Sequence, residues 1–143
     1  MFQIGIEPNN KVFLDNLSYE RDVIGEYYDD NWMRGRVAVH GGAFSGQYQA
    51  CFQTTDFLSF LSELNTLYET LKGSAKFETL EGQLSILATG NGRGQIGIEV
   101  IAIDTPGMGA VLKTVFEIDQ TELLTSIRQL KKLVVEFPVR NAE

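Results

Sequence analysis

Alternation of apolar and polar residues with a period of two covers most of the chain, and two segments of helical period interrupt it. In residues 54–73 the apolar side chains recur at the i, i+3, i+4, i+7 spacing of one helix face: Phe57, Phe60, Leu61, Leu64, Leu67, Tyr68 and Leu71. Residues 119–133 repeat this spacing, and Asp119 with Glu122 resembles a capping box at its start. The sequence therefore predicts two amphipathic helices, at about 55–72 and 120–133.

The period-two segments predict strands that pair as successive antiparallel hairpins. We expect strands at residues 2–7, 12–17, 35–40, 43–53, 75–80, 84–88, 96–104 and 110–118, and a short edge strand at 134–137. Short strands in two groups with a long helix between them are typical of an α+β fold. We expect a single domain over residues 1–143, with antiparallel sheets in a sandwich-like or strongly curved arrangement.

The stretch HGGAFSG, residues 40–46, invites comparison with hydrolases because His-Gly-Gly runs supply oxyanion-hole amides in some of them. It lacks the Gly-x-Ser-x-Gly pattern, however, and no helical pattern follows Ser45. A two-residue turn at Gly41-Gly42 instead places Val39 opposite Phe44 and puts Ser45 on the polar face of a strand. We interpret the stretch as a hairpin turn.

A second glycine-rich run, Gly90-Asn91-Gly92-Arg93-Gly94, could be mistaken for a nucleotide-binding loop. Its spacing is not Gly-x-Gly-x-x-Gly, and a strand pattern follows it where a helix would be needed. A three-residue loop at 91–93 pairs Ile86 with Ile98 and Ala88 with Ile96. We expect another hairpin here, and no cofactor.

Charge and composition indicate which classes of partner and ligand the protein can bind. The chain carries 19 acids and 12 bases, a net charge of −7, and residues 1–30 alone hold seven acids against two bases. An acidic surface disfavours nucleic acid and attracts basic proteins, although acids also serve simply to keep a protein in solution. No secretory signal or membrane-spanning run is present, and one histidine with one cysteine is too few for the usual zinc site. We expect a cytoplasmic protein without a metal, a cofactor or a membrane anchor.

Several motifs in a fixed order resemble one bacterial family. They are Asp30-Asn31-Trp32, the hairpin at 37–52 with Gly42-x-Phe44-Ser45-Gly46, FLSELNTLYETLKGSAKFETLEGQLSI at 60–86, GNGRG at 90–94 and FEIDQTEL at 116–123. Together they resemble the WapI-family immunity proteins over residues 28–133. The resemblance implies a non-enzymatic cytoplasmic protein that binds and neutralises the C-terminal domain of a cognate toxin, one that is cell-wall-associated or contact-dependent. It supplies no established residue-level site.

For the partner we consider residues 20–32, where five acids and three aromatic residues lie together. The candidate contact residues are Asp22, Glu26, Tyr28, Asp29, Asp30 and Trp32. A basic toxin domain would meet acids at the rim and an aromatic anchor at the centre. In the alternative interpretation the aromatic side chains face the core and the acids only solubilise the protein.

Other functions remain open at this stage. The chain could be an unrelated protein-binding module, or a homodimeric structural domain that pairs through an open sheet edge. An enzyme using paired carboxylates is a third possibility, because the distance between two acids depends on the fold. Both a monomer and a homodimer are compatible with the sequence.

Overall fold

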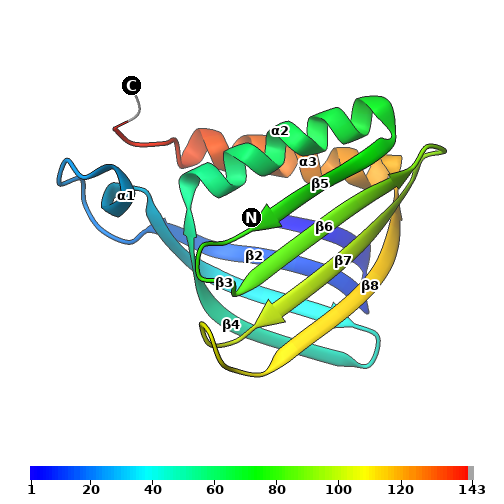
Figure 1. Ribbon diagram of the computed structural model, residues 1–143, viewed down its shortest axis with the longest axis horizontal. Helices are drawn as coiled ribbons and strands as arrows, with labels where there is room; N and C mark the ends of the chain where they lie inside the picture. The colour runs from blue at the N-terminus through cyan, green and yellow to red at the C-terminus, as the bar shows by residue number, and fades with distance from the viewer. Residues whose placement is uncertain (142–143) are drawn as a thin grey trace.

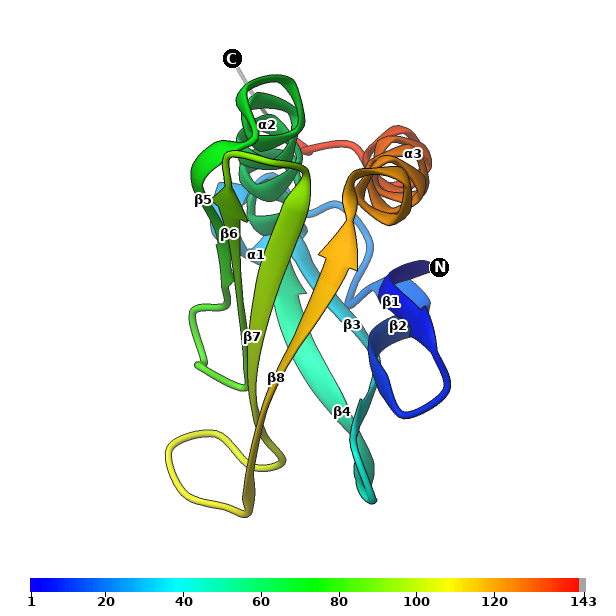
Figure 2. The same ribbon diagram turned by 90° about the vertical axis from the view of Figure 1, so that its right-hand side faces the viewer.

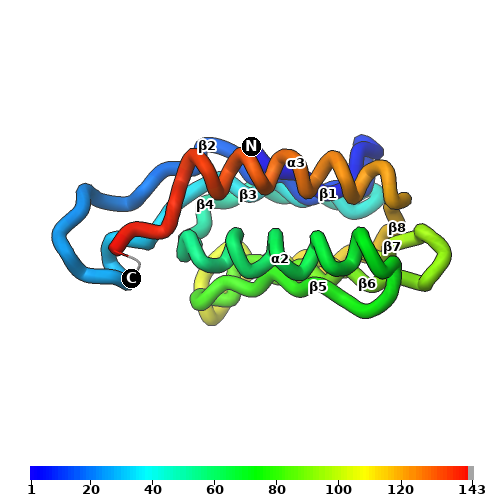
Figure 3. Tube along the Cα trace, turned by 90° about the horizontal axis from the view of Figure 1, so that it is seen from above, coloured from blue at the N-terminus to red at the C-terminus, as the bar shows by residue number. Residues whose placement is uncertain are grey.

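Two four-stranded antiparallel sheets face each other, and two long helices lie along one side of the pair (Figure 1, Figure 3). The computed structural model describes residues 1–141. The strand order is β1-β2-β3-β4 in one sheet and β5-β6-β7-β8 in the other. The elements are β1 (Phe2–Glu7), β2 (Asn10–Tyr19), α1 (Tyr27–Asp30), β3 (Trp32–Gly41), β4 (Phe44–Gln53), α2 (Thr54–Thr70), β5 (Lys72–Glu78), β6 (Leu84–Asn91), β7 (Gln95–Ile103), β8 (Val111–Asp119) and α3 (Gln120–Glu136). This architecture confirms the predicted α+β class, with sheets that do not close into a barrel.

Both predicted helices form, with different ends. Helix α2 begins at Thr54 and ends at Thr70, and the next residue, Leu71, adopts a left-handed conformation (φ 60°). Helix α3 begins at the predicted capping box, in which Asp119 Oδ1 accepts a hydrogen bond from Glu122 N–H at 2.8 Å. Within residues 1–141 no helix is long and apolar enough to cross a membrane.

The edge strand predicted at 134–137 is wrong, because α3 continues to Glu136. Leu130, Leu133 and Phe137 extend the helical spacing, and Val134 and Phe137 pack against the core from this extension. The short α1 helix has no periodic signal in the sequence and was not predicted.

The hairpins form at the predicted places but in a different register. In β3–β4, Gly41 pairs with Phe44 and Val39 with Gly46, so the turn is Gly42-Ala43. Gly42 takes the positive φ (62°), whereas Gly41 stays in the strand. A Cβ atom on Gly41 would lie 2.6 Å from Cβ of Thr114 in the opposite sheet, so Gly41 is the position where the two sheets approach closely.

The β6–β7 hairpin shows the same kind of shift. Ile86 pairs with Val100 and Ala88 with Ile98, and the loop is Gly92–Arg93–Gly94. Both loop glycines have positive φ, and Asn91 Oδ1 accepts a hydrogen bond from Arg93 N–H at 2.7 Å. In both hairpins the shift changes each residue's partner and leaves its face unchanged, so Val39 and Ile98 are buried, whereas Phe44 at the tip of the first hairpin is exposed.

A chain of aromatic rings connects both sheets through α2. Phe52 of β4 and Phe77 of β5 each lie 5.4 Å from Phe57 of α2, measured between ring centroids. Phe77 also lies 5.4 Å from Phe60, which contacts Phe2 of β1 at 6.2 Å. All five side chains are at most 2% exposed. The two sheets and the helix therefore share one core.

Replacing the central ring of this chain should destabilise the whole protein. We expect Phe77→Ala to lower the free energy of unfolding by about 3–5 kcal/mol, because a large buried cavity replaces the ring. Phe44→Ala is the matched control: Phe44 is 71% exposed, and its loss should change stability by no more than ~0.5 kcal/mol. Urea unfolding followed by tryptophan fluorescence measures both. Equal effects of the two substitutions would contradict this account of the core.

Candidate partner-binding surface

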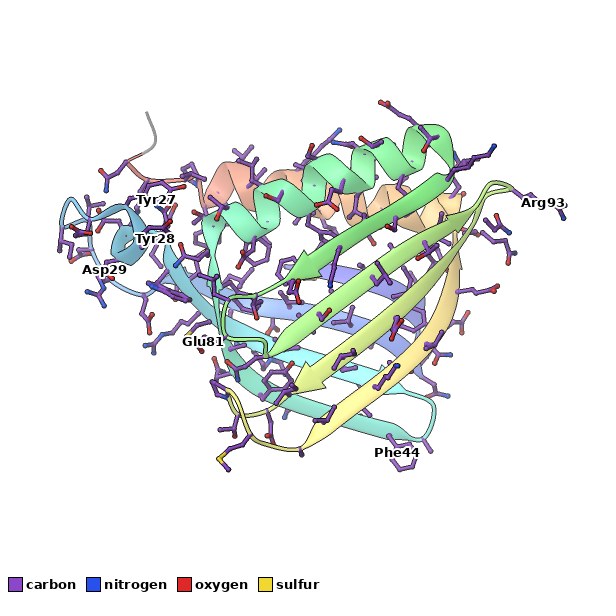
Figure 4. All side chains as sticks on the ribbon, viewed as in Figure 1. Tyr27, Tyr28, Asp29, Phe44, Glu81 and Arg93 are labelled. Carbon is purple, nitrogen blue, oxygen red and sulfur yellow. The ribbon has the colours of Figure 1, made fainter. Side chains whose placement is uncertain are left out.

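The segment between β2 and β3 projects beyond the ends of the sheets (Figure 1). It includes the single turn of α1, and Tyr27, Tyr28 and Asp29 lie at this end of the molecule (Figure 4). The candidate contact residues of the sequence analysis all come from residues 20–32, which we call the 20–32 segment. The structure therefore places five of the six on one protrusion, whereas Trp32 is the first residue of β3.

Apolar and aromatic side chains on this protrusion are exposed to solvent. Tyr28 is 66% exposed, Ile24 60% and Val23 57%. The Tyr27 ring is less exposed and packs edge-on against Tyr28, with centroids 5.3 Å apart. An exposed apolar cluster with a charged rim is a common feature of protein-binding surfaces.

Val23 and Ile24 are absent from the candidate residues predicted from the sequence. They stand as a pair between charged residues and fit neither helical nor alternating spacing. This lack of periodicity could have indicated that they are exposed, because apolar residues outside a helical or alternating pattern are not assigned to a face that packs on the core. The structure places both on the same exposed segment as the predicted Glu26 and Tyr28.

The negative charge of the 20–32 segment is partly neutralised within the protein. Arg34 Nη2 lies 3.1 Å from Glu20 Oε1, and Arg21 Nη1 lies 4.0 Å from Asp29 Oδ2. Asp22 and Glu26 are exposed and form no ion pair within residues 1–141. These two acids carry most of the charge that a partner could meet.

Asp30 has a different environment, because its side chain is buried. Its carboxylate accepts hydrogen bonds from Ile24 N–H at 2.8 Å, from Gly25 N–H at 2.9 Å and from the Asn141 side chain. The hydrogen bond from Ile24 is the main cause that lowers the pKa of Asp30, although burial opposes it. Asp30 therefore fixes the loop that displays Ile24, and its own oxygens point inward.

Asn31 is the buried centre of a second network. Its Nδ2 donates to Tyr27 O at 2.6 Å and to Arg140 O at 2.9 Å. Its Oδ1 accepts from Thr54 Oγ1 at 2.7 Å and from Arg140 N–H at 2.8 Å. One side chain thus joins α1, the start of α2 and the C-terminal tail.

The C-terminal tail completes the support of the 20–32 segment. The Arg140 guanidinium carbon lies 3.3 Å from the centroid of the Tyr19 ring, and Arg140 Nη1 donates to Arg21 O at 3.0 Å. The Tyr19 hydroxyl donates to Pro138 O, and its ring contacts Phe137. These contacts join residues more than one hundred positions apart, and nothing in the local sequence indicates them.

Trp32 lies at the start of β3, opposite Gln53, and is half-buried. The indole is therefore neither fully exposed, as expected for a partner anchor, nor fully buried, as expected for a core residue. Of the six candidate residues, the structure brings Asp22, Glu26, Tyr28 and Asp29 to the surface of the protrusion and buries Asp30.

The corrected β3–β4 register makes His40 and Ser45 direct cross-strand partners, with the side chain of His40 half-buried and that of Ser45 exposed. The neighbour of His40 on its other side is Lys11, whereas a hydrolase triad needs a carboxylate there. Among residues 1–141, no three His, Cys, Asp or Glu side chains lie together as possible metal ligands.

The pH dependence of stability tests the role of Asp30. Because its folded-state pKa lies below the unfolded value of about 3.9, ionised Asp30 stabilises the fold above that pH, and this contribution is lost as the pH falls through the folded-state pKa. Asp30→Asn should therefore be less stable than the wild type near neutral pH, and the difference should shrink below about pH 4. Asp22→Asn, an exposed acid of the same loop, is the matched control for unfolding curves at each pH. A difference for Asp30→Asn that does not vary with pH would contradict this assignment.

Comparisons with known proteins identify the family. The family model described as the immunity protein WapI-like family matches residues 3–138 of the chain. Comparison with curated proteins gives no match. The matched range extends the resemblance seen at residues 28–133 to the N-terminal hairpin, which sequence motifs alone did not connect with any family, and it includes the whole 20–32 segment. The chain thus belongs to the WapI-like immunity protein family.

Proposed function

We infer that this protein is a non-enzymatic immunity protein that binds and neutralises a cognate toxin domain in the cytoplasm. Membership of an immunity protein family supports this general role. The proposed partner is the C-terminal domain of a cell-wall-associated or contact-dependent toxin, and we expect that domain to be basic because this chain carries a net charge of −7. Neutralisation then requires occlusion of the toxin surface and no chemistry by the immunity protein.

The observation that carries the proposed contact surface is the exposure of Ile24 and Tyr28 on a segment held from within. Buried Asp30 and Asn31 and the tail residue Arg140 fix the main chain of the 20–32 segment. A segment already fixed in its binding shape loses little conformational freedom on association. The favourable free energy from burying these side chains on binding is therefore offset little by loss of conformational freedom.

The charges around these anchors suit a basic partner. Exposed Asp22 and Glu26 flank Ile24, and Asp29 follows Tyr28. Rim charges of this kind mainly accelerate encounter and select the partner, whereas desolvated aromatic and aliphatic anchors supply most of the binding energy. The two contributions are therefore separable by mutation.

Removal of the anchors should weaken the complex through faster dissociation. The first step is to test whether the gene just upstream encodes a large secreted toxin, and the C-terminal domain of that toxin is then the partner for the binding measurement. We expect Ile24→Ala and Tyr28→Ala each to lower affinity at least ~10-fold, which corresponds to about 1.4 kcal/mol. Val115→Ala, an apolar residue 67% exposed on β8, is the matched control. If the wild-type protein does not bind or inhibit this toxin domain, the proposed function is wrong.

Reversal of the rim charges should slow association. We expect the double variant Asp22→Lys/Glu26→Lys to lower the association rate constant roughly tenfold at low ionic strength and to show a weaker salt dependence. Glu69→Lys/Glu117→Lys changes the net charge equally at exposed acids outside the 20–32 segment. Stopped-flow measurement of both variants separates local from global charge. Equal slowing in the two would contradict the local assignment of the site.

A further inference from the structure

The four edge strands of the two sheets are covered unequally. Side chains of α3 bond the free edge of β1, since Ser126 Oγ donates to Gln3 O at 2.7 Å and Gln129 Oε1 accepts from Gln3 N–H at 2.9 Å. On β5, Glu63 of α2 accepts from Lys76 N–H at 3.2 Å. The two helices thus protect the edges on their own side of the molecule (Figure 2).

A groove opens at the opposite side, between β4 and the start of β8. Its volume is about 320 Å³, within the ~300–1,000 Å³ range of ligand-binding pockets. The interior is apolar, with Val39, Tyr48, Ala102 and Leu112, and the exposed side chains of Phe44 and Val111 stand at its rim. Phe44 lies at the tip of the β3–β4 hairpin, far from the 20–32 segment (Figure 4). The groove is therefore a separate surface.

Strand β4 lacks the usual protection of an exposed edge. Natural edge strands carry charges, prolines or bulges that prevent another strand from pairing with them. The sequence FSGQYQACFQ of β4 has no charged residue and no proline, and its register with β3 is continuous from Gly41–Phe44 to Trp32–Gln53. Strand β8, by contrast, carries Lys113, Glu117 and Asp119.

A hydrogen bond from Gln83 shows which main-chain groups of β4 point away from β3. Its Nε2 donates to Gln49 O at 3.3 Å, so the carbonyl of Gln49 points away from β3. Main-chain groups of alternate residues in an antiparallel strand point to the same side. The N–H and C=O groups of Ser45 and Gln47 therefore face the open side, along the groove.

We propose that this groove binds an extended segment of a partner protein, which adds to β4 as a further strand. Ser45 and Gln47 supply main-chain hydrogen bonds to the added strand, and alternate apolar side chains of that strand enter the groove. Among residues 1–141, Asp104 is the one charged residue that lines the groove. The segment therefore carries a basic residue beside its apolar ones.

Charge also favours a partner over a second copy of this chain. Two copies of a protein with net charge −7 repel each other, and pairing β4 with β4 would bring two acidic molecules together. The same negative charge attracts a basic segment and so favours its binding. This inference does not depend on the identity of the toxin or on the role of the 20–32 segment.

Gly46 offers a direct way to fill the groove. It pairs with buried Val39 and so lies on the inner face, and a Cβ atom built on it meets no heavy atom within 4 Å. Gly46→Val therefore places a Cβ atom in open space and directs its two methyl groups into the volume that incoming side chains would use. Gly97→Val is the matched control, because Gly97 lies in β7 outside the groove, where a Cβ meets its nearest neighbour, Thr89 O, at 3.8 Å.

The probe is a library of random decapeptides displayed on phage and selected against the wild-type protein. We expect enriched peptides to alternate apolar and polar residues and to contain Lys or Arg. Synthetic versions should bind Gly46→Val at least tenfold more weakly than the wild type and should bind Gly97→Val unchanged. Hydrogen exchange should show protection of the amides of Ser45 and Gln47 on binding.

The proposal is overturned if no sequence is enriched, if the peptides bind Gly46→Val as tightly as the wild type, or if protection is confined to other strands. A wild-type dimer that Gly46→Val converts to a monomer would assign the groove to a second copy and also overturn it. Should Gly46→Val fail to fold, Gln47→Pro replaces it, because it removes an outward N–H and leaves the pairing with β3. Because the toxin domain takes no part in these measurements, their failure leaves the proposed function standing.

Discussion

The packing of Phe77 between two phenylalanines of α2 is the contact on which the rest of the structure depends. The two sheets share no hydrogen-bonded ladder, so side-chain packing must hold them together. Phe57 and Phe60 of α2 contact Phe77 from β5, and they also reach Phe52 of β4 and Phe2 of β1. Burial of such large rings supplies much of the apolar contribution to stability. Helix α2 is therefore a part of the core rather than a cover added to a finished sandwich.

The 20–32 segment lies outside this core. The 20–32 segment lies beyond the sheets and is held by polar contacts of Asp30, Asn31 and the tail, which fix its shape without using the core. Buried polar groups are costly unless they are fully hydrogen-bonded, and these are well supplied with partners. A segment held in this way can change its exposed residues while the fold stays intact.

Placing both helices on one side has a consequence for the sheet edges. Side chains of α2 and α3 bond the main chains of β5 and β1, and in the part of the chain that the structure describes no helix lies over the opposite edges, β4 and β8 (Figure 2). The sequence predicted the helices and the strands, but not which edges they would cover. Edge exposure depends on strand order, and strand order follows from contacts between residues distant in the chain.

The sequence by itself determined the α+β class, the two long helices, the hairpins and the capping box at Asp119, because each depends on spacing or on contacts within a few residues. It also located the acidic, aromatic 20–32 segment and the resemblance to its family. The tertiary structure decided the hairpin registers, the continuation of α3 through Val134, the burial of Asp30 and the exposure of Ile24. Position 41 accepts only glycine because Thr114 of the other sheet leaves no room for a Cβ atom, and Asp30 turns inward towards the amides of Ile24 and Gly25 and the side chain of Asn141. The contacts with Thr114 and Asn141 join residues far apart in the chain, so their geometry exists only once the two sheets and the tail have come together.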